Sequence, residues 1–150
     1  MDATNIADVI RVGQVEVRFR LEAAQTGGNL TMFEFLVPAG ARVPVPHSHE
    51  MFDETLYGLD GSLRWTIAGR HVDVGPGEAL FIPRGTVQQF ENVGVVNARQ
   101  LSVITPGLFG PDYFREMGEV INQAGPPEVP RLVAIMQRHG LRPVLPSPRL

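Results

Sequence analysis

The sequence predicts an all-β domain followed by two short helices, and three observations support this fold class. Its 16 glycines and 13 prolines divide the chain into short apolar segments. From about residue 15 to about residue 105 these segments recur every ~8–12 residues, which is the spacing of an antiparallel sandwich or barrel. Beyond residue 107 the apolar residues are instead three and four apart, which indicates helices.

Eight segments are predicted to be strands because β-branched and aromatic residues are frequent in them and turn residues bound them. They cover residues 14–22, 29–38, 54–59, 62–68, 70–74, 78–83, 86–93 and 96–105. The strongest hairpin signal is "LDGS" at 59–62, because Asp-Gly suits the positive φ angles of a type I′ turn.

Two helices are predicted between residues 111 and 140. The apolar positions that mark them are Phe114, Met117 and Ile121 in the first and Leu132, Ile135 and Met136 in the second. Pro111 suits a first helical turn, and Gly140 suits the position that follows a helix C-terminus. Residues 141–150 are too rich in proline to continue a helix, so we expect them to be extended.

Composition and charge restrict the class of protein. A chain of 150 residues suits one domain, and its net charge of −3 without a long basic run argues against a nucleic-acid or membrane surface. The absence of cysteine excludes disulfides, thiolate metal sites and a cysteine nucleophile, so any metal must use nitrogen and oxygen ligands. Because no secretory signal or apolar run of membrane-spanning length is present, we expect a cytoplasmic protein.

The segment "PHSHEMFDE", residues 46–54, concentrates the candidate metal ligands. His47 and His49 are one residue apart, and Glu54 follows five positions later. On a strand the two histidines point to the same face, and a turn must then return the glutamate from the adjacent strand. By itself this pattern fits either a metal site or a solvated loop.

Two longer motifs resemble those of the cupin superfamily. The first, G-x5-HxH-x3,4-E-x6-G, is matched with one extra residue after the first glycine by Gly40, His47, His49, Glu54 and Gly61. The second, G-x5-PxG-x2-H-x3-N, is matched by Gly77, Pro83, Gly85 and Asn92, but Gln88 replaces the histidine. The C-terminal segments are similar to the helical tails of small single-domain bacterial cupins of the quercetin-dioxygenase-like kind.

The resemblance implies a double-stranded β-helix, or jelly-roll, barrel in a single domain. The barrel would span about 15–105, the helical tail about 111–140 and the extended C-terminus 141–150. The resemblance also implies one divalent metal ion, Fe, Mn, Ni or Zn, on His47, His49 and Glu54. Gln88 would be a fourth, weaker ligand through its carbonyl oxygen, or would hydrogen-bond a substrate or water instead.

In function, the resemblance implies a metal-dependent enzyme acting on a small organic molecule, with a dioxygenase as the first hypothesis. Isomerase, lyase and decarboxylase chemistry are alternatives, because related cupins use similar sites for them. A non-catalytic cupin that binds or senses a small ligand is the competing class. A homodimer is also implied, and residues 9–17 are expected to form an apolar N-terminal strand that pairs across a subunit edge.

Other side chains carry weaker signals. Trp65, Phe81 and Phe90 are candidates for lining a substrate pocket, or for plain core. His71, beside a predicted hairpin turn, and His139, at a predicted helix end, are expected to be structural or solvent-facing rather than ligands.

Overall fold

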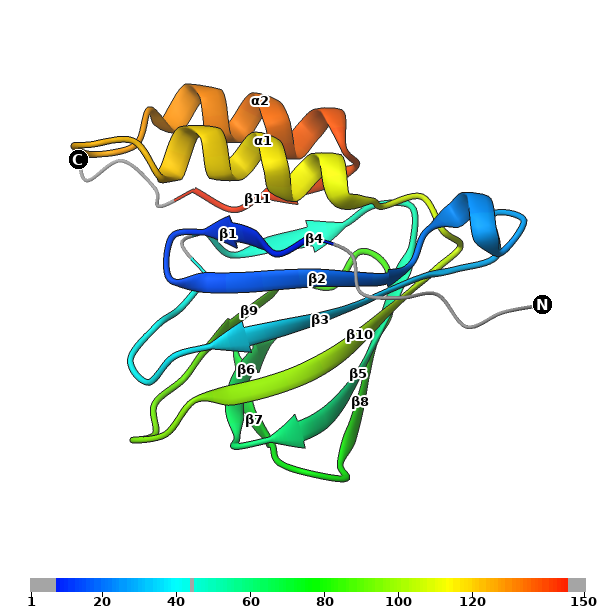
Figure 1. Ribbon diagram of the computed structural model, residues 1–150, viewed down its shortest axis with the longest axis vertical. Coiled ribbons are helices and arrows are strands. Elements are labelled where there is room, and N and C mark those ends of the chain that lie inside the picture. The colour runs from blue at the N-terminus through cyan, green and yellow to red at the C-terminus, as the bar shows by residue number, and fades with distance from the viewer. Residues whose placement is uncertain (1–7, 44, 146–150) are drawn as a thin grey trace.

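The computed structural model describes residues 8–43 and 45–145, and its strands form two antiparallel sheets (Figure 1). The first sheet has the order β1 (Ile10–Val12), β2 (Val15–Leu21), β3 (Thr31–Val37), β10 (Ala98–Thr105), β5 (Asp53–Asp60), β8 (Ala79–Ile82). The second has the order β11 (Leu141–Pro143), β4 (His47–His49), β9 (Gln88–Glu91), β6 (Leu63–Ile67), β7 (Arg70–Val74). A 3-10 turn, η1 (Ala23–Gln25), follows β2. The predicted double-stranded β-helix is confirmed.

Each predicted strand segment contains a strand. Two further strands that were not predicted, β1 and β11, lie near the two ends of the described chain. Residues 9–17 are not one strand, because the chain turns back after Val12 and Ile10 pairs with Val17. At the other end, Leu141 of β11 pairs with His49 of β4. The predicted extended C-terminus is therefore a strand of the sheet over its first three residues, and residues 146–150 lie outside the described part.

The prediction of a type I′ hairpin at 59–62 is wrong. Within that turn only Gly61 has a positive φ, 62°, and the strands on either side of it, β5 and β6, belong to different sheets. Gly61 is required there by close packing, since a Cβ would lie 2.4 Å from the carbonyl oxygen of Asn97. The β6–β7 hairpin does have two central residues with positive φ, Ala68 and Gly69, at 48° and 81°.

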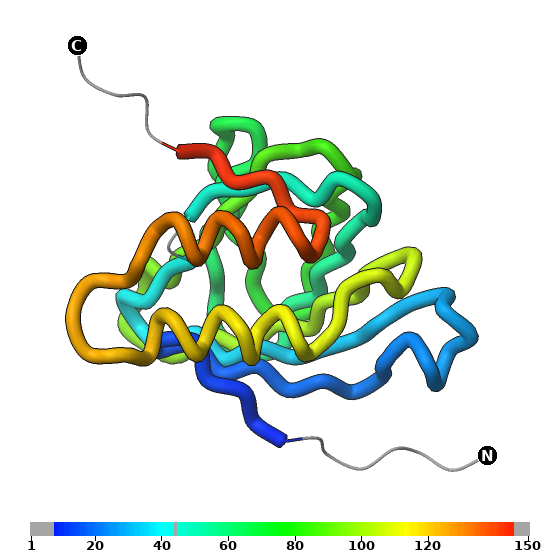
Figure 2. Tube along the Cα trace, turned by 90° about the horizontal axis from the view of Figure 1, so that it is seen from above, coloured from blue at the N-terminus to red at the C-terminus, as the bar shows by residue number. Residues whose placement is uncertain are grey.

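The two helices, α1 (Pro111–Ile121) and α2 (Val129–Arg138), lie side by side over the end of the barrel where β1, β4 and β11 lie (Figures 1 and 2). Pro111 begins the first helix and Gly140, with φ 83°, follows the end of the second, as predicted. Asn122 fastens α1 to the β1–β2 turn by donating to the Arg11 carbonyl and accepting from the Gly13 amide, both at 2.8 Å. Among the described residues no helix is both long and apolar enough to cross a membrane.

The core lies between the sheets and beneath the helices. Its fully buried side chains include Val17, Val37, Phe52, Leu56, Leu63, Trp65, Ile82, Ile104 and Met136. Trp65 is 2 % exposed, and its indole nitrogen donates to the side chain of Gln100 at 3.0 Å. Gln100 in turn donates to the Val74 carbonyl at 2.8 Å, so the buried polar groups of this chain of contacts are satisfied.

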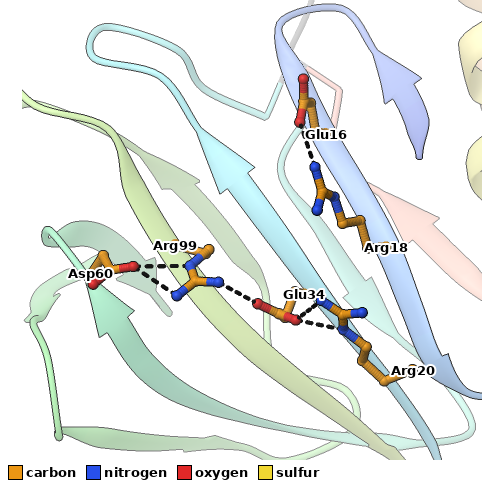
Figure 3. Close-up of polar contacts among 6 residues, drawn as sticks. All are labelled: Glu16, Arg18, Arg20, Glu34, Asp60 and Arg99. Carbon is orange, nitrogen blue, oxygen red and sulfur yellow. Dashed lines mark hydrogen bonds and ion pairs between the residues drawn. The ribbon is translucent and has the colours of Figure 1, made fainter. Parts of the chain in front are cut away.

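The outer face of the first sheet is tied together by a row of ion pairs (Figure 3). The Glu34 carboxylate on β3 accepts from Arg20 on β2, and also from Arg99 on β10 at 3.0 Å. Arg99 reaches on to Asp60 at the end of β5, with 2.9 Å between Nε and the carboxylate. This charged outer face contrasts with the apolar inner face, so a site for a small molecule is to be sought inside the barrel.

Candidate metal centre

The short strand β4 carries both candidate histidines into the barrel. The side chains of His47 and His49 lie on one face, as the alternation of a strand requires, with ring centroids 5.2 Å apart and planes 29° apart. In register, His47 is opposite Gln88 of β9 on one side and Pro143 of β11 on the other. The strand β4 is therefore held between β9, which begins at Gln88 of the second motif, and β11 of the C-terminal segment.

The structure brings all four predicted ligands to one place. Glu54 enters from β5 of the opposite sheet, and its Oε1 lies 4.0 Å from Nδ1 of His49. Nε2 of Gln88 lies 3.3 Å from the same Nδ1. Ser102 on β10 donates its hydroxyl to Oε2 of Glu54 at 2.5 Å and holds the carboxylate in place.

Burial controls the charge of these groups. Loss of water lowers the pKa of His47, against the raising effect of a hydrogen bond to the Val45 carbonyl. Burial, and then the neighbouring His47, lower the pKa of His49 to about 3. Burial raises the pKa of Glu54 to about 7, although hydrogen bonds from Ser102 and Gln88 act in the opposite direction. At neutral pH the site therefore holds two neutral imidazoles and a carboxyl group near the midpoint of its titration.

This donor set fits a divalent metal ion. Metal-bound histidines must be neutral, and burial keeps both imidazoles neutral here. Nδ1 of His47 lies 2.9 Å from the Val45 carbonyl oxygen, which is the outer contact that fixes a ligand ring and leaves Nε2 as its donor atom. As they stand, no three His, Asp or Glu side chains in residues 8–43 and 45–145 converge closely enough to enclose an ion.

The four side chains line one cavity of about 200 Å³. Its walls are mostly apolar and include Trp65 and Phe90, two of the three predicted pocket residues. The prediction for Phe81 is wrong, because this side chain is 57 % exposed on the outer face and the next residue, Ile82, points into the core. The alternation of a strand places neighbouring residues on opposite faces, so both cannot face inward.

The chain beyond β10 supplies a further part of the apolar wall, and this contribution was not predicted from the sequence. The residues concerned are Phe109, Tyr113, Phe114, Met117, Ile121, Met136 and Leu141. The spacing of apolar residues in α1 and α2 indicated buried helix faces, but a periodic pattern does not show what such a face covers.

The remaining polar candidates lie elsewhere. His71 is exposed on β7, and Nε2 of His139 lies 2.8 Å from the Glu116 carboxylate, which joins the end of α2 to α1. Asn92 of the second motif is structural, because its amide donates to the carbonyls of Val37 and Val96.

Three comparisons bear on this site. Residues 33–104 match the family model described as cupin domain. Quercetin 2,3-dioxygenase of Bacillus subtilis is 33 % identical over 102 residues, which cover 67 % of this chain and 29 % of that protein. Tetracenomycin polyketide synthase protein TcmJ of Streptomyces glaucescens is 36 % identical over 89 residues, which cover 55 % of this chain and 57 % of that protein. The chain thus spans less than two thirds of the length of either relative.

Among solved structures, one described as a predicted oxalate decarboxylase from Thermotoga maritima superposes with a TM-score of 0.62 at 24 % identity. The match covers 70 % of this chain and 96 % of that one, and at this identity it shows the fold alone. The sequence match and the structural match therefore agree on the barrel and leave the reaction open.

Proposed function

Because the chain belongs to the cupin superfamily, we propose that its buried cluster binds one divalent metal ion and that the protein is an enzyme acting on a small organic molecule. The observation that carries this proposal is the convergence of His47, His49, Glu54 and Gln88 from three strands of two sheets on one apolar cavity. Buried polar groups at the end of an apolar pocket are the usual composition of a small-molecule site.

The residues of the cluster have distinct roles in this proposal. His47 and His49 hold the ion through neutral imidazoles, and Glu54 holds it through the carboxylate that Ser102 orients. When bound, the ion supplies Lewis acidity and, if it is iron, manganese or nickel, redox chemistry. The apolar walls exclude water, which strengthens the interactions of every charged group inside.

We propose dioxygenation as the reaction. Two histidines and one carboxylate with open positions are the ligand set of non-haem iron oxygenases. The similarity to quercetin 2,3-dioxygenase of Bacillus subtilis supports the same class. Solved cupins described as an oxalate decarboxylase and a sugar phosphate isomerase keep decarboxylase and isomerase chemistry as alternatives.

A non-catalytic ligand-binding protein is the second candidate, and one observation favours it. The polar atoms of the cluster already bind one another, since the Gln88 amide contacts His49 and Ser102 donates to Glu54. Such a network is satisfied without an ion, so the cavity can hold a small ligand with no metal bound.

The test is elemental analysis of untagged protein, as purified and after anaerobic loading with Fe(II). We expect near-stoichiometric metal in the parent protein, loss in Glu54→Ala, and retention in His71→Ala, which removes an exposed histidine outside the cavity. Oxygen uptake with aromatic and dicarbonyl compounds then tests the reaction. Absence of metal after loading would reject the enzyme proposal in favour of the ligand-binding protein.

A further inference from the structure

Resting on the proposed function, we infer that the substrate is neutral beyond its metal-facing group, has an apolar body of one or two rings, and is positioned by the Tyr113 hydroxyl. The residues of the cavity walls support this substrate class whichever reaction the protein catalyses.

The size and surface of the cavity select the body of the substrate. A volume of about 200 Å³ exceeds the roughly 150 Å³ of an apolar cavity that admits benzene. The ring of Phe90 stacks on Phe35 at 5.2 Å and lies 5.0 Å from Trp65, so one wall is an aromatic surface. Phe109 and Phe114, 5.3 Å apart, line the side formed by the tail. A flat apolar ring fits between these surfaces.

The distribution of charge disfavours an anionic substrate group enclosed in the cavity between the cluster and the opening. Among the described lining residues Arg42 is the only lysine or arginine, and it is exposed, like Gly13 and Gln14. These three exposed residues mark the opening. An anionic group deeper in the cavity would lose its water without meeting a cation, which is costly. A substrate with a second anionic group enclosed between the cluster and Arg42 is therefore a poor one.

Tyr113 supplies a polar contact at the helical side. Its side chain is 7 % exposed, lines the cavity and packs against the ring of Phe109 at 4.7 Å. Its hydroxyl has no hydrogen-bond partner in the described part of the chain, and it is not fully enclosed, since every fully buried side-chain N or O atom there has a partner. Burial raises the pKa of Tyr113, so the phenol is neutral and can donate a hydrogen bond to a carbonyl or hydroxyl oxygen.

The indole N–H of Trp65, which also lines the cavity, already has a hydrogen-bond partner outside it. Its indole nitrogen donates to Gln100, so its ring offers the cavity only an apolar surface. The Tyr113 hydroxyl and the metal cluster therefore present polar groups to a substrate from the tail and from the barrel.

The experiment measures binding of three small probes to chelator-treated protein at pH 7.5. Acetophenone is neutral with a carbonyl, ethylbenzene has the same ring without a polar group, and benzoate is an anion of similar size. Trp65, the single tryptophan, lines the cavity and reports binding by its fluorescence, and calorimetry provides an independent measurement.

We expect acetophenone and ethylbenzene to bind and benzoate to bind at least about tenfold more weakly. Tyr113→Phe should weaken acetophenone by about three- to tenfold, the value of one net hydrogen bond, and leave ethylbenzene unchanged. Tyr57→Phe is the matched control, because Tyr57 is 45 % exposed and is not among the cavity residues.

Benzoate binding as tightly as acetophenone would overturn the exclusion of anions. An equal loss of both neutral probes in Tyr113→Phe would assign this side chain a structural role and overturn its role in positioning. Both measurements are made without metal, so they can succeed while elemental analysis rejects the metal site, and the two proposals can fail separately.

Discussion

The buried carboxyl group of Glu54 makes the stability of the metal-free protein depend on pH in a way that can be worked out. Its pKa is about 7 in the folded protein, against an ordinary value of 4.5. Between these values the folded state keeps a proton that the unfolded state releases. The stability contributed by this group is therefore fully present below pH 4.5 and is lost as pH rises to 7. At ~1.4 kcal/mol per pKa unit the loss is about 3 kcal/mol.

The substitution Glu54→Gln isolates this effect. Glutamine has nearly the same shape and can still accept the hydroxyl of Ser102, but it does not titrate. Urea unfolding of both chelator-treated proteins from pH 4.5 to 8 should show the variant gaining about 3 kcal/mol relative to the parent as pH rises to 7.

The histidines act in the opposite direction in both proteins. The lowered pKa values of His47 and His49 give stability that is present above pH 6.5 and lost as the pH falls, and this contribution cancels in the difference. Parallel pH profiles for parent and variant would refute the reasoning, because they would mean that Glu54 titrates alike in the folded and unfolded states.

Four further predictions test other parts of the molecule. Gln88→His should tighten metal binding on the order of tenfold by competitive chelation; unchanged affinity would show that Gln88 does not touch the metal. Leu141→Ala removes a buried side chain of β11 opposite His49, and should lower the free energy of unfolding in urea by about 2–5 kcal/mol and weaken metal binding. Unchanged metal affinity would show that β11 does not hold the candidate ligands in place. Glu34→Gln, which breaks the ion-pair row on the outer face, should cost about 1 kcal/mol, and less in high salt; a cost independent of salt would contradict an ionic origin. We also predict a homodimer, and a monomer mass by light scattering would remove that prediction.

The barrel was predictable because its strands leave a local signal. Alternation identified their positions, and the spacing of His47 and His49 placed both rings on one face before the partner strands were known. Alternation does not reveal which of two faces is the inner one in a strand of four residues, and this is why Phe81 was misplaced. The turn prediction at Gly61 was wrong for a related reason: Asp-Gly is typical of a hairpin, but here it connects strands of two different sheets.

The contribution of the tail could not be predicted, since pairing between β11 and β4 joins residues about ninety positions apart. That pairing has a consequence for the site. The strand β4 is three residues long and has a single pairing with β9, at His47 and Gln88, while all three of its residues pair with β11. The candidate ligands His47 and His49 are thus held as much by the tail as by the barrel.

The replacement of histidine by Gln88 changes the donor at the fourth position without changing its charge. A neutral imidazole and an amide are both uncharged, so the total charge of the side chains around a divalent ion would be the same with either residue. The amide differs in carrying a donor as well as an acceptor. Its N–H group contacts His49, and a hydrogen bond from Gln88 also lowers the pKa of Glu54. In the proposed metal site Gln88 would be a weaker ligand than a histidine, and its contacts with His49 and Glu54 would compete with the ion, so we expect a lower metal affinity than a histidine at the same position would give.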